Sequence, residues 1–165
     1  MTYAPIIGPI VVDDQPQLLA LAVATGLFTR QTANDLLQPA LNAAHDATEG
    51  SEHRVLASRA PDASRVTGWS YFARDPHAGG VWNVWWFGVH PHDHGTGVAQ
   101  ALLREVEHEI RLQGARVVVI ETSDADALAR ARRLYERSGY HQCGTVPDFY
   151  GMGEGKVIYA KTLAR

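Results

Sequence analysis

The sequence has one cysteine, little net charge and no long apolar run, and each of these shortages argues against a class of protein. Cys143 is the single cysteine among 165 residues, which excludes an internal disulfide and fits a reducing compartment. The net charge of −3, with no long run of lysine and arginine, argues against nucleic acid or an anionic membrane as a partner. No apolar stretch approaches the length that spans a bilayer. We also expect no signal peptide, and therefore a cytoplasmic location.

The composition is that of an ordinary globular domain. Hydrophobic residues make up 45% of the chain and charged residues 20%. With 165 residues it can bury one core, so we expect a single domain over residues 1–165. The hydrophobic patterns predict an α/β fold in the order β-α-α-β-β-β-α-β-α-β-β. The expected strands are Ile6–Val12, Val55–Arg59, Val66–Ala73, Val81–Val89, Val117–Ile120, Tyr140–Val146 and Val157–Thr162.

Local signals also mark the ends of the expected helices. Thr29 is a candidate N-cap for the second helix, and Pro39 inside that helix predicts a kink or an early stop. Asp124 or Asp126 is expected to cap the last helix, which runs to Ser138.

A strand, a short loop and a helix form the most informative stretch of the chain. Val81–Val89 is rich in β-branched and aromatic residues, and Pro91 ends the strand. Gly95 and Gly97 follow in a loop, and an apolar-periodic helix opens at Val98. The first turn of a helix leaves backbone N–H groups unpaired, and the helix dipole adds positive potential there. Such a loop can hold a phosphate or a pyrophosphate.

One interpretation of this loop is a dinucleotide site. The fingerprint G-x-G-x-x-G needs a third glycine, but Gln100 stands there, and five residues separate the strand from Gly95. Glu121, at the end of the next strand, favours this interpretation because an acidic residue there could hold a ribose.

The other interpretation is a resemblance. The stretch VHPHDHGTGVAQALL resembles the acetyl-CoA loop of the GNAT superfamily of N-acetyltransferases, whose pattern is Arg or Gln, two residues, Gly, one residue, Gly or Ala. The pattern falls on His94, Gly97 and Ala99, with histidine in place of Arg or Gln. The resemblance implies a GNAT-like mixed central sheet and acetyl-CoA as co-substrate. The implied coenzyme-binding residues are His94, Gly95, Thr96, Gly97, Val98 and Ala99, with the strand residues Phe87, Gly88 and Val89.

Those strand residues have a specific implied role. In the family a backbone N–H of the central strand binds the thioester carbonyl oxygen, and the strand edge pairs with the pantetheine amides. Gly88 fits such a place, since glycine in a strand often marks a bulge or a close backbone approach.

A second block, Leu134–Tyr140 with the sequence LYERSGY, resembles another GNAT signature. By that match Tyr135 is the candidate general acid that protonates the leaving thiolate of the coenzyme. A phenol with a pKa near 10 and a thiol with a pKa near 8.5 are close enough for proton transfer. The alternative is that Tyr135 only packs its helix against the sheet.

Acetyl transfer to an amine also needs a group that takes a proton. Glu121 follows an apolar strand, where burial could raise the pKa of its carboxyl group, and it is our candidate base. His90, a water relay, no dedicated base, or a structural role for Glu121 stay open as alternatives.

Two further features bear on the site. Asp148, Phe149 and Tyr150 resemble a D-F-Y-x-x-G block of some bacterial GNAT proteins, and we interpret them as a wall of the acceptor site in an irregular loop, with simple packing as the alternative.

His90, His92 and His94 could be metal ligands, but no second cluster completes a set, so we expect no metal.

Together these features predict an enzyme, an N-acetyltransferase that moves acetyl from acetyl-CoA to a small-molecule amine or a peptide amino group by direct attack. The alternatives are a non-catalytic acetyl-CoA-binding regulatory module of the same fold and a dinucleotide-binding protein. The sequence is compatible with a homodimer but does not identify the oligomeric state.

Overall fold

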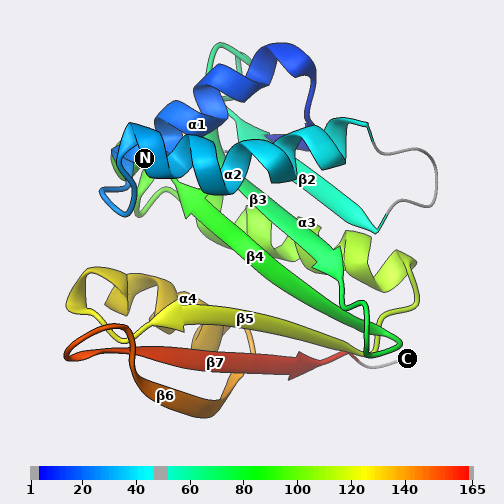
Figure 1. The fold of residues 1–165 in the computed structure, drawn as a ribbon. Helices are drawn as coiled ribbons and strands as arrows, with labels where there is room; N and C mark the ends of the chain where they lie inside the picture. The colour runs from blue at the N-terminus through cyan, green and yellow to red at the C-terminus, as the bar shows by residue number, and fades with distance from the viewer. Residues whose placement is uncertain (1–3, 47–51, 164–165) are drawn as a thin grey trace. The chain divides into compact units, whose positions relative to one another are not determined.

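The computed structural model describes residues 4–46 and 52–163, and its elements confirm the predicted order (Figure 1). The strands are β1 (Ile6–Pro9), β2 (His53–Arg59), β3 (Val66–Arg74), β4 (Val81–Val89), β5 (Val117–Ser123), β6 (His141–Gly151) and β7 (Glu154–Thr162). The helices are α1 (Gln15–Ala24), α2 (Arg30–His45), α3 (Val98–Leu112) and α4 (Ala129–Arg137), with 3-10 turns η1 (Val12–Asp14), η2 (Pro91–Asp93) and η3 (Asp126–Leu128).

The sheet is mixed, as predicted. Its strands hydrogen-bond in the order β1-β2-β3-β4-β5-β7-β6. β4 and β5 run parallel, whereas β2 is antiparallel to both β1 and β3, and β7 to both β5 and β6. The register of β4 on β5 runs from Val81 opposite Val117 to Val84 opposite Ile120. Glu121 is therefore the first residue of β5 beyond that register.

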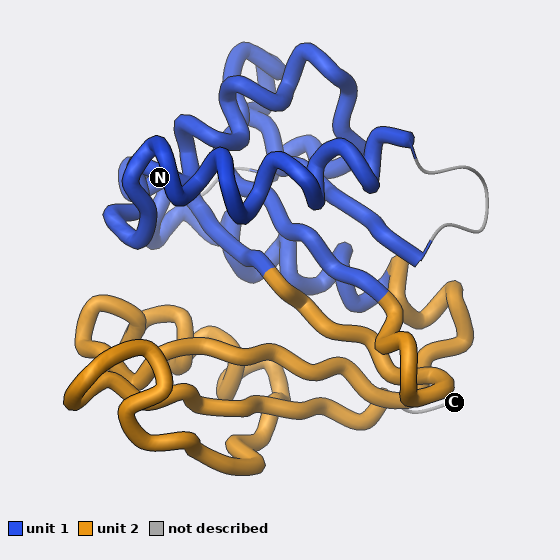
Figure 2. The backbone as a smooth tube through the Cα atoms, in the orientation of Figure 1, with its two compact units in different colours: residues 1–73, 86–108 blue, residues 74–85, 109–165 orange. Residues whose placement is uncertain are grey.

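The chain divides into two compact units, which Figure 2 colours separately. Unit 1 comprises residues 1–73 and 86–108, and unit 2 comprises residues 74–85 and 109–165. β4 and α3 each contribute residues to both units. The expectation of a single domain stays a prediction. Within the described ranges, no helix combines the length and the apolar character that a membrane span requires.

Unit 1 packs α1 and α2 with the first strands around one apolar core. Trp69 donates from its indole Nε1 to the carbonyl oxygen of Leu18 at 2.9 Å, which ties β3 to α1. Thr29 caps α2 as predicted, because its hydroxyl accepts from the N–H of Thr32. α2 continues through Pro39 to His45, so the early stop does not occur. The core includes Leu18, Leu21, Leu37, Leu41, Val55, Trp69 and Trp86.

Unit 2 is organised by the alternation of side chains along β5 and β7. The register places Ile120 opposite Tyr159, and both side chains are buried. The Tyr159 hydroxyl donates to Glu136 of α4 at 2.9 Å, so this face of the strands meets that helix. Because successive side chains alternate, Glu121 and Lys156 lie on the opposite face.

Two local predictions are wrong. α4 has no side-chain cap, and the Asp124 carboxylate instead accepts from the N–H of Gly155 at 2.8 Å, a long-range contact that a local cap pattern does not reveal. Asp148, Phe149 and Tyr150 lie in β6 rather than in a loop, because the strand extends to Gly151. The register of β6 on β7 is nevertheless interrupted between Val146 and Gly151, so these residues lack a regular partner on β7.

Candidate active site

The loop between β4 and α3 presents backbone amides at a helix N-terminus, as expected. Gly95 has φ 78° and Gly97 has φ 94°, a left-handed conformation that side chains disfavour. A Cβ atom on Gly95 would meet nothing within 4 Å, so backbone conformation and not space requires glycine there. Ala101 donates to the carbonyl oxygen of Gly97 at 3.0 Å, and the amides of Val98 and Ala99 precede this bond. The geometry suits an anion such as pyrophosphate.

An arginine that the sequence analysis missed anchors this loop. Arg65, just before β3, donates from its two terminal nitrogens to the two carboxylate oxygens of Asp93 at 2.6 and 2.7 Å. Asp93 is only 3% exposed. Its carbonyl oxygen accepts from the Thr96 hydroxyl at 2.6 Å. The ion pair therefore positions the glycine loop, and no sequence signal links two residues so far apart.

The histidines of the loop contact one another and the backbone. His94 donates from Nε2 to the carbonyl oxygen of Val89 at 3.2 Å, so one ring nitrogen braces the loop. His90 accepts from the His92 N–H at 3.2 Å, and the two rings form an edge contact. Partial burial, reinforced by the charge of His92, lowers the pKa of His90. In the described part of the chain, no group of three or more potential ligands is placed to hold a metal ion.

Gly88, in the strand segment implied to face the thioester, is fixed by its neighbours. A Cβ atom there would lie 2.4 Å from Cζ2 of Trp86, so the indole ring occupies the space of a side chain. On the neighbouring strand, a Cβ atom on Gly68 would lie 3.0 Å from the carbonyl oxygen of Gly88. The glycine thus marks a close approach, as the sequence suggested. Alternation also separates the two adjacent tryptophans, since Trp85 is exposed and Trp86 is buried.

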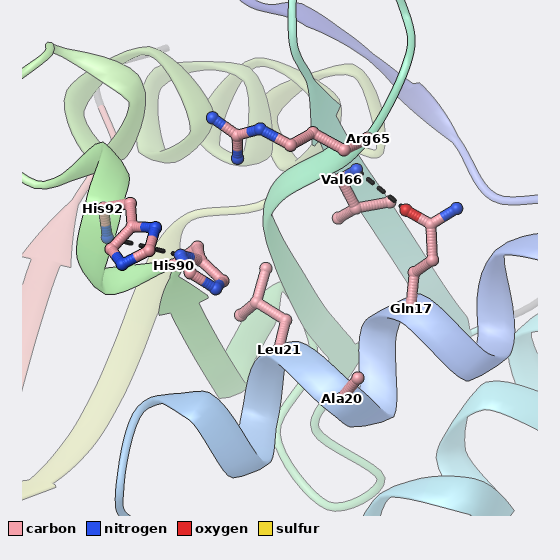
Figure 3. Close-up of a pocket in the computed structure, with 7 residues that line it drawn as sticks. All are labelled: Gln17, Ala20, Leu21, Arg65, Val66, His90 and His92. Carbon is pink, nitrogen blue, oxygen red and sulfur yellow. Dashed lines mark hydrogen bonds between the residues drawn. The ribbon is translucent and has the colours of Figure 1, made fainter.

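Beside the loop, unit 1 has a hollow of about 410 Å³ (Figure 3). Helix α1 contributes its apolar residues Ala20 and Leu21, and His90 and His92 come from the loop. Gln17 accepts from the N–H of Val66 at 3.1 Å. The hollow is lined by Gln17, Ala20, Leu21, Arg65, Val66, His90 and His92.

In unit 2, Tyr135 is buried in an aromatic group. Its ring centroid lies 5.8 Å from that of Tyr159 and 6.2 Å from that of Tyr140. Burial, with a smaller contribution from Tyr159, raises the pKa of Tyr135 well above the ordinary value of a phenol. The hydroxyl group therefore stays protonated at neutral pH, but its pKa lies further from that of a thiol than the sequence analysis assumed, so proton transfer from it to a thiolate is less favourable. Its role as general acid stays a prediction.

Unit 2 also brings together Glu121 and the predicted acceptor wall, through a lysine that the sequence analysis did not identify. Lys156 donates from Nζ to Glu121 Oε2 at 2.6 Å. The same Nζ lies 3.7 Å from the ring centroid of Phe149. Glu121 is thus a partly exposed, ion-paired carboxylate rather than the apolar-surrounded group that the sequence suggested. The base role stays a prediction.

The segment of β6 that carries Asp148, Phe149 and Tyr150 is tied to the following turn by one hydrogen bond. Asp148 has φ 53°, and its Oδ1 accepts from the N–H of Gly153 at 2.7 Å. Phe149 and Tyr150 form an edge contact with centroids 5.0 Å apart, and both are about half exposed. Burial raises the pKa of Tyr150, against the charge of Lys156.

Comparison with known proteins gives a family and several similar folds. The model of the acetyltransferase (GNAT) family matches residues 20–140. A protein of Desulfovibrio desulfuricans assigned to the GNAT family has a solved structure that is 27% identical, with a TM-score of 0.87 and coverage of 98% of this chain and 100% of that one. An aminoglycoside 6′-N-acetyltransferase in complex with coenzyme A is 17% identical, with a TM-score of 0.77 and coverage of 97% and 98%, which shows the fold alone.

One curated relative is similar over part of its length. S-(2-succino)cysteine N-acetyltransferase of Bacillus subtilis (strain 168) is 28% identical over 95 residues, which are 57% of this chain and 55% of the relative. The chain therefore matches about half the length of that curated relative.

Proposed function

This chain belongs to the GNAT family of acetyltransferases, and on that premise we propose that it transfers an acetyl group from acetyl-CoA to a primary amine. The observation that carries the proposal is the loop with two left-handed glycines that feeds α3. It is built from unit 1 alone and lies in the part of the chain that the family model matches. The family match also draws residues from both units, which supports one functional domain.

The loop residues fit the coenzyme through their main chain. The amides of Gly97, Val98 and Ala99 would hold the pyrophosphate, and a histidine in place of the usual Arg or Gln is compatible with this because His94 braces the loop. The edge of β4 at Phe87, Gly88 and Val89 would pair with the pantetheine and supply the N–H for the carbonyl oxygen. Acetyl-CoA supplies a thioester-activated acetyl group when bound.

The proton steps fall to Glu121 and Tyr135. An acceptor arrives as an ammonium group at neutral pH, and Glu121 takes one proton so that the nitrogen lone pair can attack. The N–C bond forms, the C–S bond breaks, and the leaving sulfur receives a proton from the Tyr135 hydroxyl. The nitrogen gives up its second proton, which restores the phenol, and Glu121 returns its proton to solvent. No covalent enzyme intermediate and no metal is required in this scheme.

The proposed setting follows from the same features. The single exposed cysteine fits the cytoplasm, where thiols stay reduced. The acceptor is a small-molecule amine or a peptide amino group, and a homodimer stays a prediction. The curated relative that acts on S-(2-succino)cysteine supports a small amino-acid-like acceptor.

Calorimetric titration with acetyl-CoA, coenzyme A and NAD tests the proposal. We expect acetyl-CoA binding that is lost in Gly97→Val, because a β-branched residue is strained at φ 94°. Gly8→Ala is the matched control, since a Cβ atom there meets nothing within 4 Å. Tight binding without acetylation of any amine in a library would favour a regulatory module instead. A preference for NAD over coenzyme A would instead support the interpretation of the loop as a dinucleotide site.

A further inference from the structure

The face of β5 and β7 that lies opposite the face meeting α4 holds the ammonium group of Lys156. Glu121 lies opposite Ile158, and Lys156 lies opposite Ser123, so Glu121 and Lys156 are diagonal neighbours on one face. The Lys156 side chain is 14% exposed and that of Glu121 is 33% exposed. The lysine Nζ is in contact with a carboxylate on one side and an aromatic ring face on the other. This is the environment that a cationic acceptor needs, occupied by the chain's own lysine.

We propose that the Glu121–Lys156 pair is a two-point site for an acceptor whose amine sits next to a free carboxylate, that is, an α-amino acid. The inference rests on the proposed function and names its acceptor. Glu121 receives the ammonium group of the acceptor, and Lys156 turns to its carboxylate. Lys156 is then a specificity-determining residue, and Glu121 keeps its role as base.

Charge balance favours this acceptor over a simple amine. A monoamine that enters as an ammonium ion meets the positive charge of Lys156 beside the carboxylate it needs, and one of the two cations is left without a partner. An α-amino acid brings one charge of each sign, so all four charges are paired after it binds. A peptide N-terminus, whose neighbouring carbonyl is an uncharged amide, lacks the second charge.

The dimensions agree with an adjacent carboxylate. Standard bond lengths place the nitrogen and the nearer carboxylate oxygen of an α-amino acid about 3 Å apart. That span is close to the 2.6 Å contact between Lys156 and Glu121, so the zwitterion can bridge the pair after a small movement of the flexible lysine. A carboxylate several carbons from the amine would not bridge the two groups in this way.

The aromatic wall beside the pair provides a surface for the acceptor side chain. Phe149 is 51% exposed and Tyr150 is 50% exposed. The neighbouring carboxylate of Glu154 accepts from the Ser123 hydroxyl at 2.5 Å, so it is already hydrogen-bonded. Burial is the main cause of the raised pKa of the Tyr150 hydroxyl; the charge of Lys156 lowers this pKa, and those of Glu121 and Glu154 raise it. The charged groups and the wall therefore form one electrostatic cluster.

The test compares each of the twenty common L-amino acids with its amide, on wild type and on Lys156→Met. Methionine keeps the apolar stem and removes the charge. Lys161→Met is the matched control, because Lys161 lies on the same strand but on the opposite face and donates to Ser138. Affinity is measured by calorimetry on protein saturated with coenzyme A, and kcat/KM is measured with acetyl-CoA.

We expect wild type to prefer at least one amino acid over its amide by about tenfold to a hundredfold, the range of a hydrogen bond to a charged group. The preference should fall to about twofold or less in Lys156→Met and persist in Lys161→Met. Acetylation that is indifferent to the carboxylate, or a preference that survives Lys156→Met, would overturn the inference and leave the proposed function intact. A Lys156-dependent binding preference without acetyl transfer would uphold the two-point site and refute the proposed function.

Discussion

Substituting Gly88 by alanine should destabilise the protein, because the added Cβ atom would clash with the side chain of Trp86. The new Cβ atom would lie 2.4 Å from Cζ2 of Trp86, a distance that Cβ atoms do not adopt. The indole cannot easily withdraw, because it is 6% exposed and contacts the rings of Phe28 and Trp69, whose centroids are 5.2 and 5.4 Å away. Overpacking a well-filled core costs about 1–3 kcal/mol, and the confined ring places this site at about 3 kcal/mol.

Thermal and urea unfolding measure this cost. At about 2–4 °C per kcal/mol for a chain of this length, Gly88→Ala should lower Tm by roughly 6–12 °C. Gly8→Ala in β1 is the control, because a Cβ atom there meets nothing within 4 Å, and its effect should stay within about 0.5 kcal/mol.

A double-mutant cycle identifies the collision as the cause. Trp86→Phe removes Cζ2, and it removes no hydrogen bond, since the buried Nε1 of Trp86 has no partner in the described part of the chain. In the Trp86→Phe background, Gly88→Ala should cost about 1 kcal/mol or less, a coupling of about 2 kcal/mol. A cost that is the same in both backgrounds, or below about 0.5 kcal/mol in wild type, would refute the reasoning.

Three further predictions concern the loop and the candidate acid. Asp93→Asn, which removes the charge that Arg65 contacts, should cost about 2 kcal/mol of unfolding free energy and weaken acetyl-CoA binding about tenfold, as unfolding and calorimetry would show. Tyr135→Phe should lower kcat about a hundredfold with little change in acetyl-CoA affinity, and an unchanged kcat would exclude the general-acid role. The lowered pKa of His90 means that the folded chain binds this proton less readily than the unfolded chain. Its contribution to stability is therefore present above the ordinary histidine pKa of about 6.5 and is lost as pH falls, and an NMR titration should place its pKa below that value and show it rising in His92→Asn.

Local patterns predict local structure well in this chain. The strand at Val81–Val89 matches its expected bounds, and α3 opens at Val98, because the hydrophobic period, Pro91 and the glycines all act within a few residues. Glycine conformations at Gly95 and Gly97 follow from the same short-range logic.

The contacts that complete the candidate site could not be predicted in this way. Lys156 and Glu121 are 35 residues apart, and their contact depends on the register of β7 against β5. A shift of one residue in that register would place the two side chains on opposite faces of the sheet. Asp124 likewise accepts a hydrogen bond from Gly155 rather than capping its own helix. This contact could not be predicted from local patterns, because the strand that supplies the N–H lies far along the chain. Sequence patterns identified Glu121, Phe149 and Tyr150 as candidates, but not Lys156, which contacts both Glu121 and Phe149.

The ion pair between Arg65 and Asp93 has a consequence for how the loop opens. The two residues are 28 positions apart, so the contact depends on the folded arrangement of the chain between them. In native-state hydrogen exchange, the amide of Thr96 should then exchange together with the first amides of β3, rather than with the fraying first turn of α3. Such joint exchange would assign the glycine loop to the same cooperative unit as β3, so that fraying of the first turn of α3 leaves the loop in place.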